Sequence, residues 1–205
     1  MAKTAPDPLL AATPHVDHTD PSIRNLATTL APPGAPTTDV ARAAFEYVRD
    51  RVPHTASTDR QIVTIAASTV LAEGTGICHA KANLLAALLR SRGIATGFGF
   101  QRLTLADDES EGYCLHAFAI ARLDGRLVPL DPRPDAKFST DDPRLMFPSP
   151  LLDDESTLPG LWANPDPGTM AALEVASTLD AALAALPDQP SVPPLDPTFA
   201  VTSTR

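Results

Sequence analysis

The sequence predicts an α+β domain in which helices come first along the chain and antiparallel strands follow. Three observations support this prediction. Apolar residues recur at helical spacing over residues 37–92, segments rich in aromatic and β-branched residues follow them, and an Asp-Gly pair joins two of those segments. Helices and strands grouped in this way are typical of α+β domains, whereas parallel α/β folds alternate the two.

The size and composition of the chain allow one domain with a packed core. The chain has 205 residues, of which 43% are hydrophobic, and a formal net charge of -9. This charge argues against nucleic acid or an anionic membrane surface as a partner, because both attract basic patches.

The longest apolar run of the central helix, LLAALL, is too short to span a membrane, and the N-terminus shows no signal peptide. Two cysteines do not make a disulfide framework, so we expect a cytoplasmic protein.

Proline clusters divide the chain into three parts. We expect an irregular N-terminal segment over residues 1–36, a domain over residues 37–186, and a Pro-rich, disordered tail over residues 187–205. The sequence gives no indication of an oligomeric state.

Three helical segments are expected in the first half of the domain. Residues 37–52 form an amphipathic helix that begins at Thr37-Thr38-Asp39 and ends before Pro53. Residues 59–76 form a second helical or mixed segment that closes at two glycines. The third helix runs from Cys78 to about Arg92, and Gly93 ends it in a left-handed conformation.

The second half of the domain is expected to hold the strands. Residues 93–105 read as a strand and residues 106–112 as an acidic loop. Residues 113–132 read as two strands joined by a turn at Asp124-Gly125, the strongest short hairpin signal. A proline-rich, loop-like stretch follows, and then one alanine-rich helix over residues 170–186.

The position of Cys78 at the start of a helix favours a chemical role over a packing role. A cysteine in the first helical turn lies at the positive end of the helix dipole, beside unpaired backbone N–H groups. Such a position lowers the thiol pKa and favours the nucleophilic thiolate. The same N–H groups could stabilise an oxyanion once a carbonyl is attacked.

His116 is the one histidine expected inside a strand. His79 adjoins Cys78 but should point about a quarter-turn away from it on a helix, and His54 follows a proline at a helix end. His15 and His18 lie in the irregular N-terminal segment.

The hairpin register brings His116 to an aspartate. A two-residue turn at Asp124-Gly125 pairs Leu123 with Arg126, and counting back pairs Phe118 with Asp131. His116 and Asp131 are then diagonal neighbours on one face of the hairpin. An aspartate placed in this way could orient the imidazole and stabilise its protonated form. The alternative is a half-buried strand histidine and an aspartate that only begins an Asp-Pro turn.

Two segments resemble the transglutaminase-like superfamily of cysteine enzymes: GTGICHAKANLLAALLRSRGIATGF and LHAFAIARLDGRLVPLDPR. The family pattern has a Gly-x-Cys at a helix start, an Arg-x-x-Gly-Ile at its end, a strand His-Ala and an Asp-Pro after the next strand. Cys78, His116 and Asp131 match these positions. A wider resemblance, to bacterial stand-alone proteins of this type, covers about residues 8–188. It implies a papain-like fold, with the cysteine helix packed on an antiparallel sheet that carries the histidine and the aspartate.

The resemblance also implies acyl transfer through a thioester. Cys78 would attack an amide, ester or thioester carbonyl of an acyl donor, His116 would move the proton, and Asp131 would hold the imidazole. Water or an amine would then resolve the acyl-enzyme, without a cofactor or metal. The alternatives are a catalytically inactive binding or scaffold protein that keeps the fold, and a metal-dependent hydrolase.

Three further groups stay open. Gln101 could donate to the oxyanion or be a plain strand residue. Cys114 has the strand parity of His116, so it either faces the site, pairs with Cys78 or packs in the core. A metal site made of Cys78, His79 and His116 has no recognised ligand spacing.

Overall fold

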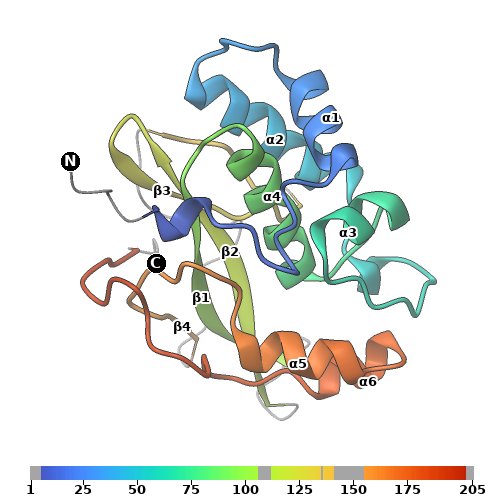
Figure 1. Ribbon diagram of the computed structural model, residues 1–205. Helices are drawn as coiled ribbons and strands as arrows, with labels where there is room; N and C mark the ends of the chain where they lie inside the picture. Colours follow the sequence, from blue (N-terminus) through green and yellow to red (C-terminus); the bar gives the residue numbers. More distant parts are fainter. Residues whose placement is uncertain (1–5, 106–111, 135, 141–154, 202–205) are drawn as a thin grey trace.

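The structure is a computed structural model that describes residues 6–105, 112–134, 136–140 and 155–201. Within these ranges an antiparallel sheet of four strands, in the order β3-β2-β1-β4, packs with helices (Figure 1). This arrangement confirms the α+β prediction. The elements in chain order are η1 (Pro8–Leu10), α1 (Pro21–Leu30), α2 (Thr37–Arg51), η2 (Thr55–Ser57), α3 (Ala67–Glu73), α4 (Cys78–Ser91), β1 (Thr96–Thr104), β2 (Tyr113–Leu123), β3 (Arg126–Leu130), β4 (Ser156–Thr157), α5 (Pro167–Val175) and α6 (Leu179–Ala184).

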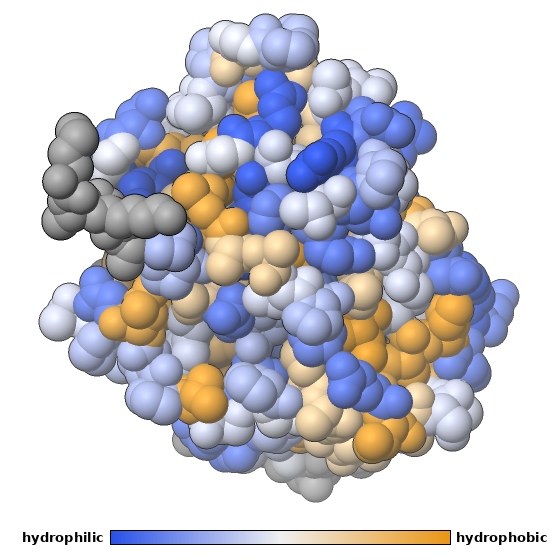
Figure 2. Space-filling model, viewed as in Figure 1, coloured by the Kyte–Doolittle hydropathy of each residue, from blue (hydrophilic) through white to orange (hydrophobic). Residues whose placement is uncertain are grey.

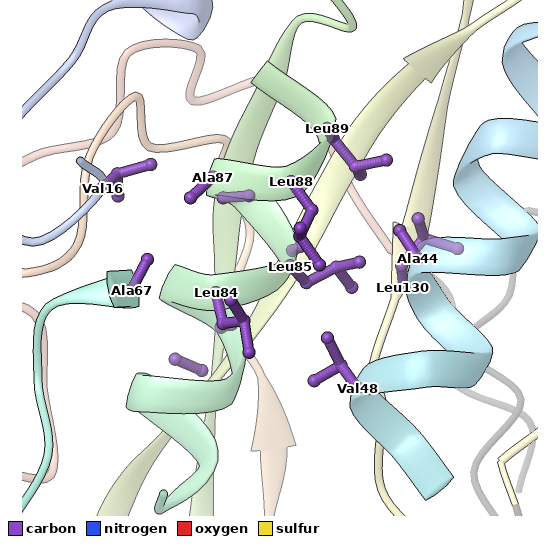
Figure 3. Close-up of a cluster of buried hydrophobic side chains, with 14 of the residues drawn as sticks. Val16, Ala44, Val48, Ala67, Leu84, Leu85, Ala87, Leu88, Leu89 and Leu130 are labelled. Carbon is purple, nitrogen blue, oxygen red and sulfur yellow. The ribbon is translucent and has the colours of Figure 1, made fainter. Parts of the chain in front are cut away.

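Helix α4 is the centre of the core. All of its residues from His79 to Arg90 are buried, and the helix packs against α1, α2, α3, β1 and β2. A helix that is apolar around most of its circumference is stable only when it is enclosed in this way. Figure 3 shows its leucines pointing toward Ala44 and Val48 of α2 and toward Leu130 of β3.

The β2-β3 hairpin has the register that its turn predicts. Leu123 pairs with Arg126, and both turn residues have positive φ, 48° at Asp124 and 79° at Gly125. Positive φ at both central positions is the geometry of the tight turn that Asp-Gly favours. Ala119 pairs with Leu130, so Asp131 directly follows the last paired residue of β3.

Both faces of the sheet are covered. Alternate residues of β2 such as Leu115 and Ala117 belong to the main core with α4, whereas Phe118 and Ile120 belong to a second cluster. That second cluster includes Leu161 and one side chain from near each end of the described chain, Leu9 and Val201. The terminal segments are therefore part of the packed structure.

The N-terminal segment contains a helix that the sequence analysis did not expect. The expectation of irregular chain over residues 1–36 is wrong for α1, which packs against α4. The Asp20 carboxylate accepts the N–H of Ser22 at 2.8 Å, and Pro21 occupies the first helical position. An aspartate cap followed by proline is a helix-start signal, because proline lacks only an N–H that would be unpaired there.

The C-terminal region also differs from the expectation. The single helix expected over residues 170–186 is divided into α5 and α6, because the Thr178 hydroxyl accepts the N–H of Ala181 and starts a new helix. The tail expected to be disordered is positioned as far as Val201. The backbone carbonyl of Pro187 accepts the N–H of Leu115, and the carbonyl of Val192 accepts the indole N–H of Trp162.

Other expectations have mixed outcomes. The mixed segment of residues 59–76 contains α3, which ends at Gly74 in a left-handed conformation. Most of the expected acidic loop, residues 106–111, lies outside the described residues, so it stays a prediction together with the three-part division of the chain.

None of the helices in the described ranges has the length and hydropathy needed to cross a membrane. The face in Figure 2 mixes polar and apolar side chains, with apolar patches at the lower right, over α5 and α6.

Candidate active site

The residues before Cys78 fix the point where α4 begins. The Thr75 hydroxyl donates to the carbonyl of Pro53 at 2.9 Å and holds this loop against the chain that follows α2. Gly76 lies so close to α4 that a Cβ there would be 2.8 Å from the Cβ of Ala80. Only glycine allows this approach. Cys78 is then the first residue of the helix.

The N-terminus of α4 has no side-chain cap. Ile77 occupies the capping position in an extended conformation, and the N–H of Lys81 is the first in the helix to bond back to its carbonyl, at 2.9 Å. The N–H groups of the first turn, including that of Cys78, therefore lack a capping partner from Ile77. Their partial positive charge favours an anion beside Cys78.

His116 and Asp131 form a buried pair, as the hairpin register predicts. Nε2 of His116 lies 2.8 Å from Oδ2 of Asp131. The same oxygen accepts from Nε of Arg133 at 2.7 Å. Asp131 therefore has two cationic partners, one of which is the imidazole beside Cys78.

The ionisation of the three residues supports an ion pair between thiolate and imidazolium. Burial opposes protonation of His116, but the negative charges of Asp131 and Cys78 outweigh it and raise the His116 pKa to about 9. Burial opposes ionisation of Asp131, whereas His116 and Arg133 lower its pKa. Burial also opposes ionisation of the Cys78 thiol, but His79, His116 and His54 together bring its pKa well below the ordinary value.

Two histidines that the sequence analysis set aside lie at the thiol. Nδ1 of His79 is 3.3 Å from Sγ of Cys78, so the expectation that it points away is wrong. Successive helical residues point about 100° apart, but the imidazole is long enough to turn back toward its neighbour. His54 lines the same cavity and lies close enough to the thiol to lower its pKa. Its Nδ1 accepts the N–H of Ala56 at 3.2 Å.

A cavity of about 360 Å³ gives access to Cys78, which is half-buried. Its wall is mostly apolar and includes the following side chains: Ala56, Ile77, Leu103, Leu105, Leu183 and Leu186. Its polar wall includes these: His54, Cys78, Lys81, Cys114, His116, Asp131 and Arg133. The leucines of the α6 region thus line the same cavity as the catalytic candidates. This distribution is typical of a small-molecule or side-chain pocket with few, specifically placed polar groups.

Gln101 occupies a supporting position. It lies opposite His116 in the sheet, but it is not among the described residues that line the cavity. Its amide nitrogen donates to the Thr157 hydroxyl at 2.9 Å, and its amide oxygen accepts from Arg133 at 3.3 Å. This geometry holds Arg133 against Asp131 and gives no support to the expected oxyanion role of Gln101.

Cys114 faces the cavity, which is one of the three positions left open by the sequence. It is a free cysteine, as is Cys78. Burial, together with the charges of Cys78 and Glu155, raises its pKa to about 12. Cys114 therefore stays a neutral thiol near neutral pH. Across the described ranges, no group of three or more His, Cys, Asp and Glu side chains is arranged to hold a metal ion.

Solved structures similar to this chain include three bacterial proteins. A candidate cysteine protease from Cytophaga hutchinsonii has a TM-score of 0.48 and 18% identity over 61% of this chain and 40% of its own. The periplasmic domain of TgpA from Pseudomonas aeruginosa has a TM-score of 0.43 and 20% identity over 60% of this chain and 45% of its own. A candidate protease from Parabacteroides distasonis has a TM-score of 0.41 and 17% identity over 55% of this chain and 23% of its own. The chain thus spans less than half the length of each. No curated protein matches it.

The family model carries the assignment. The model described as "Transglutaminase-like superfamily" matches residues 24–132, which is more than half of the chain. The match includes Cys78, His116 and Asp131, and it covers α2, α3, α4 and the β1-β2-β3 part of the sheet. The chain belongs to the transglutaminase-like superfamily, a family of cysteine enzymes.

Proposed function

We propose that this protein catalyses acyl transfer through a thioester on Cys78, with His116 and Asp131 completing a catalytic triad. The observation that carries the proposal is the buried His116–Asp131 pair, 2.8 Å apart, beside a half-buried cysteine at an uncapped helix start. A nucleophile, a base next to it and a group that orients the base are the parts that covalent acyl transfer requires.

The first half of the reaction acylates the enzyme. The Cys78 thiolate attacks the carbonyl carbon of an amide, ester or thioester, so a C–S bond forms and the carbonyl oxygen becomes an oxyanion. His116 holds its Nε2 against Asp131, which leaves Nδ1 as the nitrogen that gives its proton to the departing amine, alcohol or thiol. The bond to the leaving group then breaks, and a neutral His116 faces a thioester on Cys78.

The second half releases the acyl group. Neutral His116 takes a proton from water or an amine as that nucleophile attacks the thioester carbonyl. The C–S bond breaks, the thiolate returns, and the product is an acid with water or an amide with an amine. Asp131 stabilises the imidazolium that this step regenerates.

The oxyanion has two donors in this proposal: the backbone N–H of Cys78 and the imidazole of His54. The N–H of Ala56 donates to Nδ1 of His54, so Nδ1 must be an acceptor and the ring proton must lie on Nε2. His54 lines the cavity and lies close enough to the Cys78 thiol to lower its pKa, so in this proposal its Nε2–H is the group that donates to the oxyanion.

The acyl donor in this proposal carries an apolar group. The apolar wall of the cavity includes leucines from the β1 end and from the α6 region: Leu103, Leu105, Leu183 and Leu186. A peptide, amide, ester or thioester with an apolar group beside the reacting carbonyl fits such a wall. The expected cytoplasmic location also stays a proposal, and the low cysteine count is in keeping with it.

Turnover of model acyl donors tests this function. Apolar p-nitrophenyl esters and peptide p-nitroanilides would be incubated with the enzyme, with and without ethylamine, and the acid and amide products would be measured by mass spectrometry. We expect turnover by the wild type and by Cys114→Ala, which removes the other thiol, and none by Cys78→Ala. Turnover by folded Cys78→Ala would exclude the mechanism. A folded wild type that never acylates would favour the binding or scaffold alternative.

A further inference from the structure

Lys81 is a buried lysine in the wall of the catalytic cavity. It lies one helical turn after Cys78 on α4 and is only 3% exposed. Within the described part of the chain, no carboxylate lies within ion-pair distance of its ammonium group and no hydrogen bond involves its side chain. Arg90 on the same helix is equally buried, but its guanidinium donates to the carbonyls of Thr96, Ala11 and Ala163.

Burial of an ammonium group without a direct partner is costly in free energy. The burial of Lys81 lowers its pKa, and the charges of Asp131, Cys78 and Asp50 offset only part of that effect, so the pKa is about 8. Lys81 therefore carries a positive charge for most of the time near neutral pH. Methionine or leucine would fill such a position without this cost, so a buried charge with no direct partner among the described residues points to a bound anion.

Among the described residues that line the cavity, the charged groups leave one positive charge unbalanced. The imidazolium of His116 and the guanidinium of Arg133 balance the Cys78 thiolate and the Asp131 carboxylate. Lys81 is the additional cation, and His54, His79 and the neutral Cys114 thiol are the other titratable groups near Cys78. Glu155, whose charge raises the Cys114 pKa, is not among the described residues that line the cavity. Acylation removes the thiolate charge and the His116 proton together, so the excess persists in the acyl-enzyme. This local excess is opposite in sign to the net charge of the chain, -9.

We propose that Lys81 binds an anionic group of the acyl donor, most simply a carboxylate, and holds it beside the carbonyl that Cys78 attacks. The inference rests on the proposed function of Cys78 and deepens it. A carboxylate at Lys81 gives the ammonium the direct ion pair that the described residues do not provide. The donor is then an amphipathic acyl compound, with an apolar group against the leucine wall and a carboxylate against α4.

Two alkylating reagents of nearly the same size test this site without knowledge of the substrate. Iodoacetate carries a carboxylate and iodoacetamide a neutral amide, and both form a C–S bond to the Cys78 thiolate as iodide leaves. The ratio of their rate constants at Cys78 is independent of the thiolate fraction, because both reagents need the same thiolate. The same ratio for N-acetylcysteine gives the intrinsic preference of a thiol.

Three variants complete the test. Lys81→Met removes the charge and keeps the length, Lys81→Arg keeps the charge, and Lys137→Met removes the charge of an exposed lysine outside the cavity. We expect the iodoacetate-to-iodoacetamide ratio of the wild type to exceed that of N-acetylcysteine and to fall by roughly tenfold in Lys81→Met, which corresponds to about 1.4 kcal/mol. The ratio should persist in Lys81→Arg and Lys137→Met.

The outcomes separate this inference from the proposed function. A ratio that does not change in folded Lys81→Met overturns the anion site, even while Cys78 stays reactive. Equal losses with both reagents also overturn it, because Lys81 would then act on the thiolate alone. If Lys81→Met does not fold, a wild-type ratio no higher than that of N-acetylcysteine overturns the site. Absence of alkylation at Cys78 in the wild type contradicts the proposed function itself, and the inference falls with it.

Discussion

Nε2 of His116 lies 2.8 Å from Oδ2 of Asp131, and both side chains are buried. This hydrogen bond commits one nitrogen of the imidazole to the carboxylate, so the other nitrogen is the one available to Cys78. Removal of water from the pair strengthens their electrostatic interaction. The same pair therefore orients the ring and favours its protonated form.

We expect the acyl-transfer rate to have a bell-shaped dependence on pH. The thiolate forms as the pH rises through the lowered Cys78 pKa, and the imidazolium is lost as the pH rises through the His116 pKa of about 9. The rate constant kcat/KM should therefore fall on the alkaline side near pH 9, with a plateau below it. Measurement of kcat/KM across the pH range at constant ionic strength tests this. A falling limb near the ordinary histidine value of about 6.5 would contradict the effect of Asp131 and Cys78 on His116.

Asp131→Asn should slow acylation and move the alkaline limb of its pH profile to lower pH. The amide keeps a hydrogen-bonding group near His116 but removes the charge that raises the His116 pKa. We expect a loss of up to about 10⁴ in the rate, the value measured for a triad aspartate in a serine protease, and a smaller loss where the thiolate is already formed. Single-turnover acylation by folded Asp131→Asn and Cys78→Ala provides the comparison. An Asp131 effect larger than the Cys78 effect would argue against these roles.

His54→Ala should impair acylation far more than alkylation. Loss of one oxyanion donor costs about 10²–10³ in kcat in other enzymes. Alkylation of Cys78 by iodoacetamide forms no oxyanion, so its rate should change only as much as the thiolate fraction changes. His54→Gln, which offers an amide N–H, should recover part of the acylation rate. Equal effects of His54→Ala on both reactions would show that His54 acts on the thiol alone.

Arg90→Met should destabilise the fold without a direct effect on chemistry. The substitution leaves the buried carbonyl of Thr96 and the partly buried carbonyl of Ala11 without the donors that Arg90 provides. We expect the free energy of unfolding to fall by about 3 kcal/mol or more, whereas Arg126→Met at the exposed hairpin end should change it by about 0.5 kcal/mol or less. Urea denaturation of the two variants is the measurement. A similar small effect at both positions would contradict the structural role of Arg90.

The parts of the site that depend on local pairing could be predicted from the sequence. The Asp124-Gly125 turn sets the hairpin register, and that register places His116 beside Asp131. The start of α4 at Cys78 could be predicted as well, because the preceding glycines end one helix before the next begins. In both cases the signal lies within about 20 residues of chain.

The remaining parts depend on contacts between distant segments. His54 reaches the thiol because the N–H of Thr55 donates to the carbonyl of Gly76 at 3.3 Å, and no local pattern encodes this contact. The burial of Lys81 depends on how α4 packs with the rest of the cavity wall. Gln101 lies in the predicted strand, but its amide nitrogen donates a hydrogen bond to the Thr157 hydroxyl on the short strand β4. Pairing with such a short strand has no periodic signal in the sequence.

The thioester on Cys78 is the central claim, and the mass of the trapped acyl-enzyme tests it most directly. Wild-type protein and Cys78→Ala would be mixed briefly with p-nitrophenyl acetate and analysed by intact-mass spectrometry and peptide mapping. We predict one acetyl group per wild-type chain, located on Cys78 and released by hydroxylamine, and none on Cys78→Ala. An unmodified Cys78, or equal acetylation of the two proteins at another residue, would contradict the account.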